Sequence, residues 1–236
     1  DNLYGNVARR IWTLNTNGTG FLRLTPVFKT LGKRVDVRTP VFSADGKTVY
    51  YGYGEASANG SGVTRTWSVA ADGSSLPDLL DIPASCSTGS VPSVDPATGK
   101  VMILQETCAN SADEGFFFFT ADNQATEPVL AFGDLDTRFD QARWTPDGSL
   151  FVFAARQSNI SSLYAYVPAQ KKLAIIVQGT DALAVEAGAV SPDGNYVVYC
   201  ATEGGAGTNI HVLDLTKEPA VDTPVTKDGI SCHPAF

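Results

Sequence analysis

The sequence SPDGNYVVYCA at residues 191–201 consists of a turn followed by a run of strand-forming side chains. In such a turn, proline fixes φ, aspartate hydrogen-bonds nearby backbone amides and glycine accepts positive φ. Related turns begin at Ser43, Asp95 and Thr145, so the four turns start 52, 50 and 46 residues apart. Each is followed by β-forming residues, at 48–53, 101–106, 150–155 and 196–201. The four turns therefore predict a repeat architecture built from strands.

Each repeat contains the pattern of four strands. An inner strand of small and apolar residues precedes the turn, and an almost continuously apolar second strand follows it. Third strands are predicted at 64–70, 115–121, 162–167 and 209–213, and fourth strands at 76–82, 128–132, 173–178 and 223–226. No segment predicts a convincing helix. A strand repeat near 50 residues is typical of a β-propeller, so we expect an all-β fold of about five four-stranded antiparallel blades.

The two ends of the sequence predict a composite blade. Residues 8–15 resemble the third strands, 21–25 resemble the fourth strands, and 231–236 resemble the inner strand at 37–42. We therefore expect a single domain over 1–236. Its blades are expected at approximately 1–36 plus 229–236, 37–84, 85–134, 135–183 and 184–228. An alternative is that a neighbouring molecule completes the split blade, which would generate a filament.

The repeat motif resembles that of TolB-type, WD-repeat-like β-propellers. The segments that carry the resemblance are TPVFSADGK at 39–47, RWTPDG at 143–148 and VSPDG at 190–194. The resemblance covers nearly the whole chain and implies a periplasmic or extracellular protein that binds other proteins. Some relatives are lyases or accessory domains of peptidases. The chain departs from the periplasmic TolB-type propellers in three expected features. It has about five blades instead of six, it has no N-terminal α/β domain, and its cysteines lie outside the repeat motif.

The four cysteines favour one pairing of the three possible. Counting outward from the turn at 95–99 places Cys86 opposite Cys108 across two antiparallel strands. The same count around the turn at 191–194 places Cys200 opposite Val185, which leaves Cys232 as its partner. Two disulfides predict an oxidising compartment, hence an extracellular or periplasmic protein. Four buried free thiols are the alternative.

Three Asn-x-Ser/Thr sequons begin at Asn17, Asn59 and Asn159, each in a predicted turn or loop. Each is a candidate site of N-glycosylation, which agrees with secretion.

The net charge of −8 argues against a nucleic-acid partner, because such partners require clustered lysine and arginine. No apolar run approaches the roughly 18 residues that span a bilayer, so we expect no membrane span. No signal peptide is recognised, and the sequence starts at Asp1 as a mature or trimmed protein would.

Few residues suggest catalysis. The two histidines, His211 and His233, are too few for a multi-histidine metal site, and no nucleophile motif accompanies them. Three aspartates in one loop, Asp134, Asp136 and Asp140, are a weak candidate for binding Ca²⁺, the alternative being a solvated acidic loop. We expect no cofactor and no enzymatic activity.

These observations predict a secreted, non-enzymatic β-propeller that acts as a scaffold for protein–protein interaction. One alternative function is a structural subunit of an extracellular filament or coat. Another is a carbohydrate-binding or polysaccharide-cleaving protein, suggested by the many tyrosine and tryptophan residues in the blades, although most alternate within strands and suit packing between blades.

Overall fold

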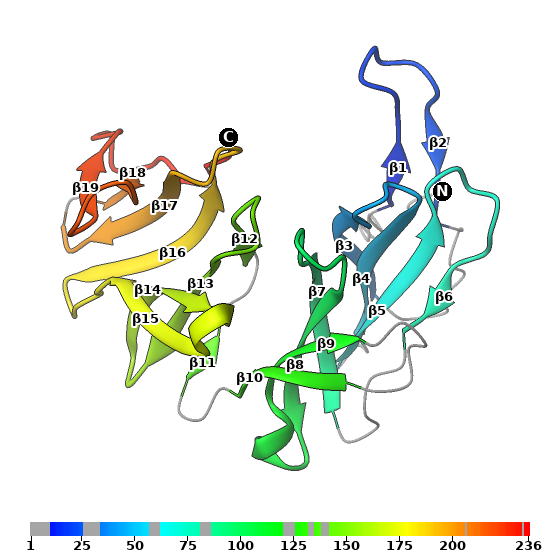
Figure 1. The fold of residues 1–236 in the computed structure, drawn as a ribbon, viewed down its shortest axis with the longest axis horizontal. Helices are drawn as coiled ribbons and strands as arrows, with labels where there is room; N and C mark the ends of the chain where they lie inside the picture. Colours follow the sequence, from blue (N-terminus) through cyan, green and yellow to red (C-terminus); the bar gives the residue numbers. More distant parts are fainter. Residues whose placement is uncertain are drawn as a thin grey trace. The chain divides into compact units, whose positions relative to one another are not determined.

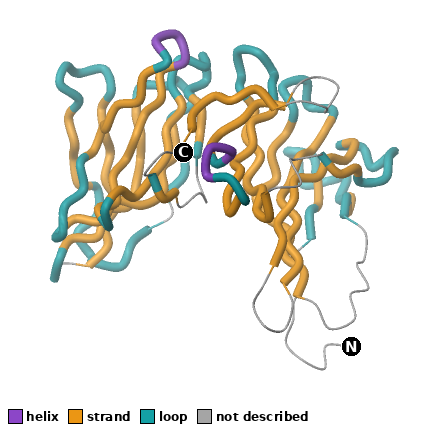
Figure 2. The backbone as a smooth tube through the Cα atoms, turned by 90° about the horizontal axis from the view of Figure 1, so that it is seen from below, coloured by secondary structure: helices purple, strands orange, loops and turns teal. Residues whose placement is uncertain are grey.

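The fold was obtained as a computed structural model, which describes residues 10–25, 34–56, 62–80, 86–119, 126–131, 135–137, 142–205, 207–232 and 234–236. Strands dominate it, and the described helices are two 3-10 turns at Ser111–Asp113 and Pro168–Gln170 (Figures 1 and 2). The chain divides into two compact units. Unit 1 comprises Asp1–Val94 and Gly99–Gly133, and unit 2 comprises Asp95–Thr98 and Asp134–Phe236.

Unit 1 contains a hairpin and two blades. The hairpin pairs β1 (Trp12–Thr13) with β2 (Leu22–Arg23). The first blade consists of β3 (Arg34–Phe42), β4 (Thr48–Ala56), β5 (Gly62–Ala70) and β6 (Asp78–Leu79). The second consists of β7 (Cys86–Val94), β8 (Val101–Cys108), β9 (Gly115–Phe119) and β10 (Thr126–Ala131). Neighbouring strands within each blade are antiparallel, and one parallel residue pair, Thr64 with Thr88, joins the blades into one sheet.

Unit 2 contains two more blades. In the third blade, β11 (Asp136–Thr137) and β12 (Arg143–Trp144) both pair with β13 (Phe151–Gln157), which continues into β14 (Ile160–Val167) and β15 (Lys172–Val177). The fourth blade consists of β16 (Leu183–Val190), β17 (Tyr196–Glu203), β18 (Gly207–Asp214) and β19 (Val221–Pro224). The all-β propeller prediction is confirmed.

The described residues form four blades, against the prediction of about five. At the N-terminal end, β1 and β2 occupy the predicted third and fourth strands, but each is only two residues long. The described part of 229–236 forms no strand and contributes one bridge, between Ile230 and Thr208. The split fifth blade is thus not formed as a four-stranded sheet in the described part of the chain. Its completion and the predicted blade boundaries remain predictions.

The repeated turns are closed by side-chain hydrogen bonds within the motif. In the third blade the Thr145 hydroxyl donates to Asp147 Oδ1 (2.6 Å) and accepts from the Leu150 amide (2.9 Å). The Ser149 amide donates to the same Asp147 oxygen (3.0 Å). Ser43 with Asp45, and Ser191 with Asp193, repeat this arrangement. These aspartates therefore hold the turns in shape.

The same bonds link stability to pH. The Thr145 hydroxyl and the Ser149 amide lower the pKa of Asp147 from 3.8 to about 2. A carboxylate with a lowered pKa in the folded state stabilises above its unfolded pKa, and this contribution is lost as pH falls from about 4 to about 2. Because Asp147 is exposed, screening limits the effect to about 1 kcal/mol or less. We expect the urea midpoint to fall more between pH 6 and pH 2.5 in the wild type than in Asp147→Asn, and equal falls would contradict this prediction.

In three of the four turns the glycine lies against the turn of the preceding blade. These glycines have φ between +70° and +75°. In unit 2, a Cβ built on Gly148 would lie 2.7 Å from Ala97 Cβ, and one on Gly194 would lie 3.4 Å from Pro146 Cδ. In unit 1, a Cβ on Gly99 would lie 3.6 Å from Ala44 Cβ, whereas one on Gly46 would meet nothing within 4 Å. Adjacent turns thus pack on one another through the position that the motif reserves for glycine.

A bulge recurs in the inner strands. The register with the second strand shifts between Arg38 and Val41 in the first blade, between Ser90 and Ser93 in the second, and between Glu186 and Gly188 in the fourth. In the fourth blade this shift places Cys200 opposite Glu186. The predicted position opposite Val185 was therefore wrong by one residue, because the ladder next to the turn pairs Val190 with Val197, two residues from the register that the count assumed, and the bulge reverses only one of the two.

Within each unit the hydrophobic core lies between neighbouring elements of the propeller. In unit 2 the facing sides of the third and fourth blades bury Leu163, Ala165, Val197, Tyr199 and Leu213, together with smaller side chains. In unit 1 one cluster lies between the β1–β2 hairpin and the first blade, and a second cluster lies between the first and second blades. Strands that are apolar on both sides can contribute to two such clusters, which explains the continuous apolar runs after the turns.

Candidate functional site: an exposed aromatic face

The β1–β2 hairpin has one face that packs on the first blade and one exposed face. Its register pairs Trp12 with Arg23 and Thr13 with Leu22, so alternate residues point to opposite sides. On the packed face Leu22 is still 37% exposed. Ile11 and Leu24 are 6% and 5% exposed in the shared core, and the Thr13 hydroxyl donates to the Ala71 carbonyl (3.5 Å).

The other side of the hairpin is the aromatic face, consisting of Trp12, Leu14, Phe21 and Arg23. Trp12, Leu14 and Phe21 are 43%, 57% and 66% exposed. The rings of Trp12 and Phe21 are stacked, with centroids 4.5 Å apart and planes 17° apart. The Arg23 guanidinium lies over the Trp12 ring, 5.9 Å from its centroid. The loop of this hairpin extends beyond the blades of unit 1 (Figure 1).

This combination of side chains is suited to binding another molecule. Tryptophan, phenylalanine and arginine are enriched where protein surfaces meet, and charged residues are depleted at the centre of such contacts. Apolar side chains that are grouped on one exposed face mark interaction sites more often than scattered ones do. The stacked pair also fixes both rings before binding, which lowers the entropy lost on association.

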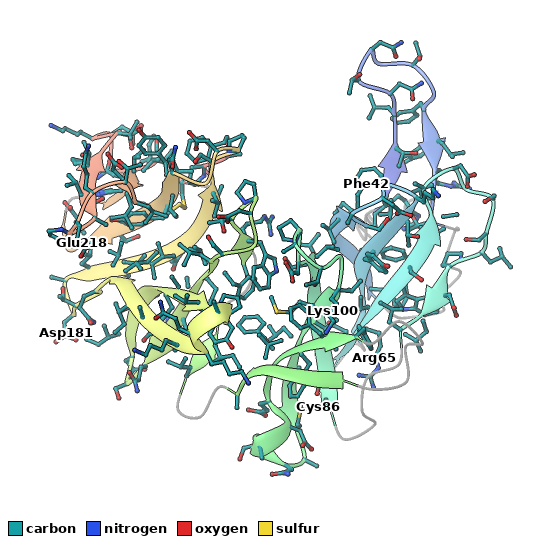
Figure 3. The ribbon with its side chains drawn as sticks, in the orientation of Figure 1. Phe42, Arg65, Cys86, Lys100, Asp181 and Glu218 are labelled. Carbon is teal, nitrogen blue, oxygen red and sulfur yellow. A yellow bond between two sulfur atoms is a disulfide. The ribbon has the colours of Figure 1, made fainter. Side chains whose placement is uncertain are left out.

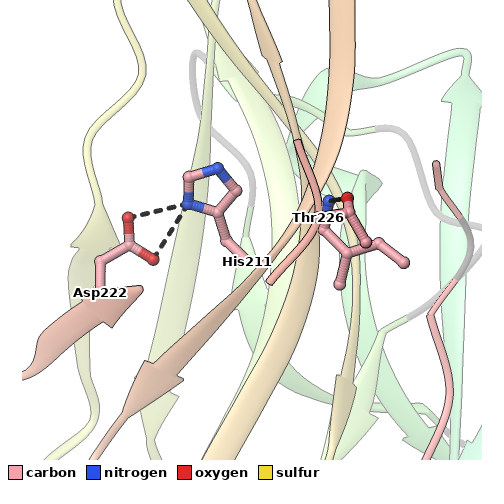
Figure 4. Close-up of polar contacts among 4 residues, drawn as sticks. His211, Asp222 and Thr226 are labelled. Atoms are coloured by element: carbon pink, nitrogen blue, oxygen red, sulfur yellow. Dashed lines mark hydrogen bonds and ion pairs between the residues drawn. The ribbon is translucent and has the colours of Figure 1, made fainter. Parts of the chain in front are cut away.

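A pair of polar side chains, His211 and Asp222, lies in the fourth blade (Figure 4). His211, which is 6% exposed, places Nδ1 3.0 Å from Asp222 Oδ2 and 3.3 Å from Oδ1. Tyr199 packs beside it, with ring centroids 5.4 Å apart. Burial, and secondarily the Asp222 carboxylate, raises the pKa of the Tyr199 hydroxyl. Beside this pair the Ile210 amide donates to the Thr226 hydroxyl (2.9 Å). Among the described residues the imidazole bonds only Asp222, so the pair fastens β19 to β18.

Both predicted disulfides are present. Cys86 is bonded to Cys108 across β7 and β8, and Cys200 on β17 is bonded to Cys232. The alternative of four free thiols was therefore wrong. The Arg65 guanidinium donates to the Cys86 carbonyl (2.8 Å), which ties β5 to the first disulfide (Figure 3).

The structure tests little of the remaining predicted site. Asp134, Asp140, His233 and Asn59 lie outside the described residues, and Asp136 lies on β11 opposite Arg156. The Ca²⁺ site thus remains a prediction. In the described part of the chain, no three His, Cys, Asp or Glu side chains are grouped so that they could hold a metal ion.

The two remaining sequons are both exposed, at the turn after β1 for Asn17 and between β13 and β14 for Asn159. The sequence predicted strands at 8–15 and 21–25, but the aromatic face was not predicted. The available signal was that both sides of Ile11-Trp12-Thr13-Leu14 carry apolar residues.

No protein-family model matches the chain, and no curated protein matches it. Among solved structures, TolB from Acinetobacter baumannii matches with a TM-score of 0.65 at 17% identity, covering 92% of this chain and 48% of TolB. Oligogalacturonate lyase in complex with manganese matches with a TM-score of 0.65 at 12% identity, covering 93% and 60%. A chain of a nidogen/laminin complex matches with a TM-score of 0.59 at 11% identity, covering 95% and 76%.

This chain thus spans about half the length of TolB and 60% of the lyase. None of the described helices is long and apolar enough to cross a bilayer. At these identities the likeness concerns the fold alone. Four-stranded blades, each containing the repeated turn, give the chain a TolB-like β-propeller fold.

Proposed function

We propose that this chain is a secreted, non-enzymatic β-propeller module that binds a protein partner through the aromatic face. The observation that carries the proposal is the exposed stack of Trp12 on Phe21, with Arg23 over the tryptophan. On the opposite side of the hairpin, Ile11 and Leu24 are buried against the first blade, which holds the hairpin while it presents these side chains.

The chemistry of the face defines the partner. Each Å² of apolar surface that a partner removes from water contributes roughly 25 cal/mol to the free energy of binding. The aromatic rings supply most of this surface. Arg23 remains charged and offers several donors, which pair best with a carboxylate. The expected partner surface is therefore apolar at its centre and carries an aspartate or glutamate at the edge that meets Arg23.

Two of the similar solved structures support a role in protein binding outside the cytoplasm. The nidogen/laminin complex is an assembly of two proteins, and a chain within it has this architecture. Two disulfides and the likeness to TolB fit an extracellular or periplasmic location.

The test uses a photo-crosslinking amino acid at Leu14, with the same group at Phe42 as the matched control. Phe42 is 53% exposed and lies in unit 1 outside the aromatic face. In an extract of the source organism, we expect the Leu14 position to give one protein adduct that the Phe42 position does not give. The Trp12→Ser/Phe21→Ser variant should abolish that adduct and weaken binding of the purified partner at least tenfold.

Three outcomes would overturn the proposal. Equal adducts from both positions would mean that the aromatic face has no special role. An adduct only with a second copy of this chain would show self-assembly through the face instead. Binding of oligosaccharides that quenches Trp12 fluorescence, with no protein adduct, would identify a carbohydrate site.

A further inference from the structure

In the sequon at Asn17 the asparagine carboxamide and the threonine hydroxyl are already hydrogen-bonded to each other. Asn17 is exposed in the turn between β1 and β2. Its Oδ1 accepts hydrogen bonds from the Thr19 hydroxyl (2.7 Å) and the Thr19 amide (3.1 Å). Gly18 between them has φ +81°, and a Cβ built on it would meet nothing within 4 Å. The turn is closed by the Gly18 amide, which donates to the Asn15 carbonyl (2.8 Å). The sequon is thus folded on itself in open surroundings.

The sequon at Asn159 is built into the sheet. Ser158 and Asn159 form the turn between β13 and β14, with φ of 49° and 69°, and the next residue, Ile160, already pairs with Gln157. The hydroxyl of Ser161, which the sequon requires, donates to the Val185 carbonyl on β16. This serine therefore holds the third blade to the fourth, and its hydroxyl is bonded to that carbonyl and not to the asparagine that it would have to assist.

We propose that Asn17 carries an N-linked glycan in the mature protein and that Asn159 does not. In this modification, Asn17 Nδ2 forms a bond to C1 of an oligosaccharide carried on a polyprenyl diphosphate. The bond between C1 and the diphosphate oxygen breaks, the diphosphate leaves with the bonding electrons, and the amide nitrogen gives up one proton to a base of the transferase. A carboxamide nitrogen is a weak nucleophile, because its lone pair is delocalised into the carbonyl.

The arrangement at Asn17 favours this reaction. The Thr19 hydroxyl lies on the carboxamide that must react, and among the described residues no hydrogen bond occupies Asn17 Nδ2. The transferase can therefore engage the folded turn without breaking a strand. At Asn159 the same engagement would have to break the pairing of β13 with β14 and the contact with β16. The inference requires export of the chain and is independent of the partner proposed above.

The test is peptide mapping of the chain secreted from a host with an N-linked transferase, alongside a reporter glycoprotein. Enzymatic release of the glycan converts a modified asparagine to aspartate, which mass spectrometry locates. We expect conversion at Asn17 and none at Asn159, whatever is found at Asn59. Thr19→Val should remove the Asn17 glycan, Thr19→Ser should retain it, and Asn159→Gln should leave the glycan mass unchanged.

An unmodified Asn17 in a preparation whose reporter is modified would overturn the inference, and so would a modified Asn159. Because the mapping reads the wild-type chain directly, it does not depend on whether a variant folds. Failure here would leave the crosslinking result at Leu14 unaffected, so the two proposals fail separately.

Discussion

Replacing Gly148 by alanine is expected to destabilise the folded chain by about 2–5 kcal/mol. Holding a residue with a Cβ at φ +71° costs about 1–2 kcal/mol. The new methyl group would also lie 2.7 Å from Ala97 Cβ and 3.0 Å from Asp95 Oδ1, and overpacking of this kind adds about 1–3 kcal/mol. Urea unfolding followed by fluorescence measures the change.

The matched control is Gly46→Ala. Gly46 has φ +70° in the same kind of turn, but a Cβ built there meets nothing within 4 Å. Only the backbone term remains, so we expect a loss of about 1–2 kcal/mol. If the two variants lose the same stability, the turns do not pack on one another as the structure indicates.

Leu163→Ala is expected to destabilise the chain by about 2–5 kcal/mol. Leu163 is fully buried on β14, where it packs into the cluster between the third and fourth blades. Truncation removes three carbon atoms from this cluster and leaves a cavity, because the facing strands are held by their own hydrogen bonds. The midpoint of thermal or urea unfolding reports the loss.

Leu76→Ala is the control for this change, because Leu76 is 87% exposed and the same atoms are removed. Its effect should stay within about 0.5 kcal/mol. A loss below about 1 kcal/mol for Leu163→Ala would contradict the packing of these two blades in unit 2.

The fold was predictable from sequence because the signals that set it are local. Each turn is specified by four or five adjacent residues, and the apolar runs after the turns mark strands that are covered on both sides. The pairing of Cys86 with Cys108 was predicted correctly, although the turn at 95–99 does not set it alone: the bulge between Ser90 and Ser93 shifts the ladder by one residue and brings the two cysteines opposite each other.

The errors came from features that have no local signal. Next to the turn of the fourth blade Val190 pairs with Val197, two residues from the register assumed by centring on 191–194, and a bulge near Glu186 reverses one of the two. Nothing in the adjacent side chains marks either shift. The number of blades depends on whether strands from distant parts of the chain pair. The two-residue lengths of β1 and β2 could not be read from their amino-acid types.

The candidate site was missed because exposure is a property of the assembled sheet. Ile11 and Trp12 are adjacent and both apolar, yet one is buried against the first blade and the other is 43% exposed. Alternation separates the two sides of a strand, but when both sides are apolar it does not tell which one the protein covers. The difference between the sequons at Asn17 and Asn159 was equally hidden, because it depends on the hydrogen-bond partner of the hydroxyl in each.

The hydrogen bonds within the repeated turns have a consequence for synthesis. Each hydroxyl bonds an amide only five positions further along the chain, so the turn needs no residue from another blade. Loops of about ten residues close within about 100 ns and hairpins form in about 1–10 μs, whereas a ribosome adds about 5–20 residues each second. Each inner hairpin therefore has time to form before the next one is translated.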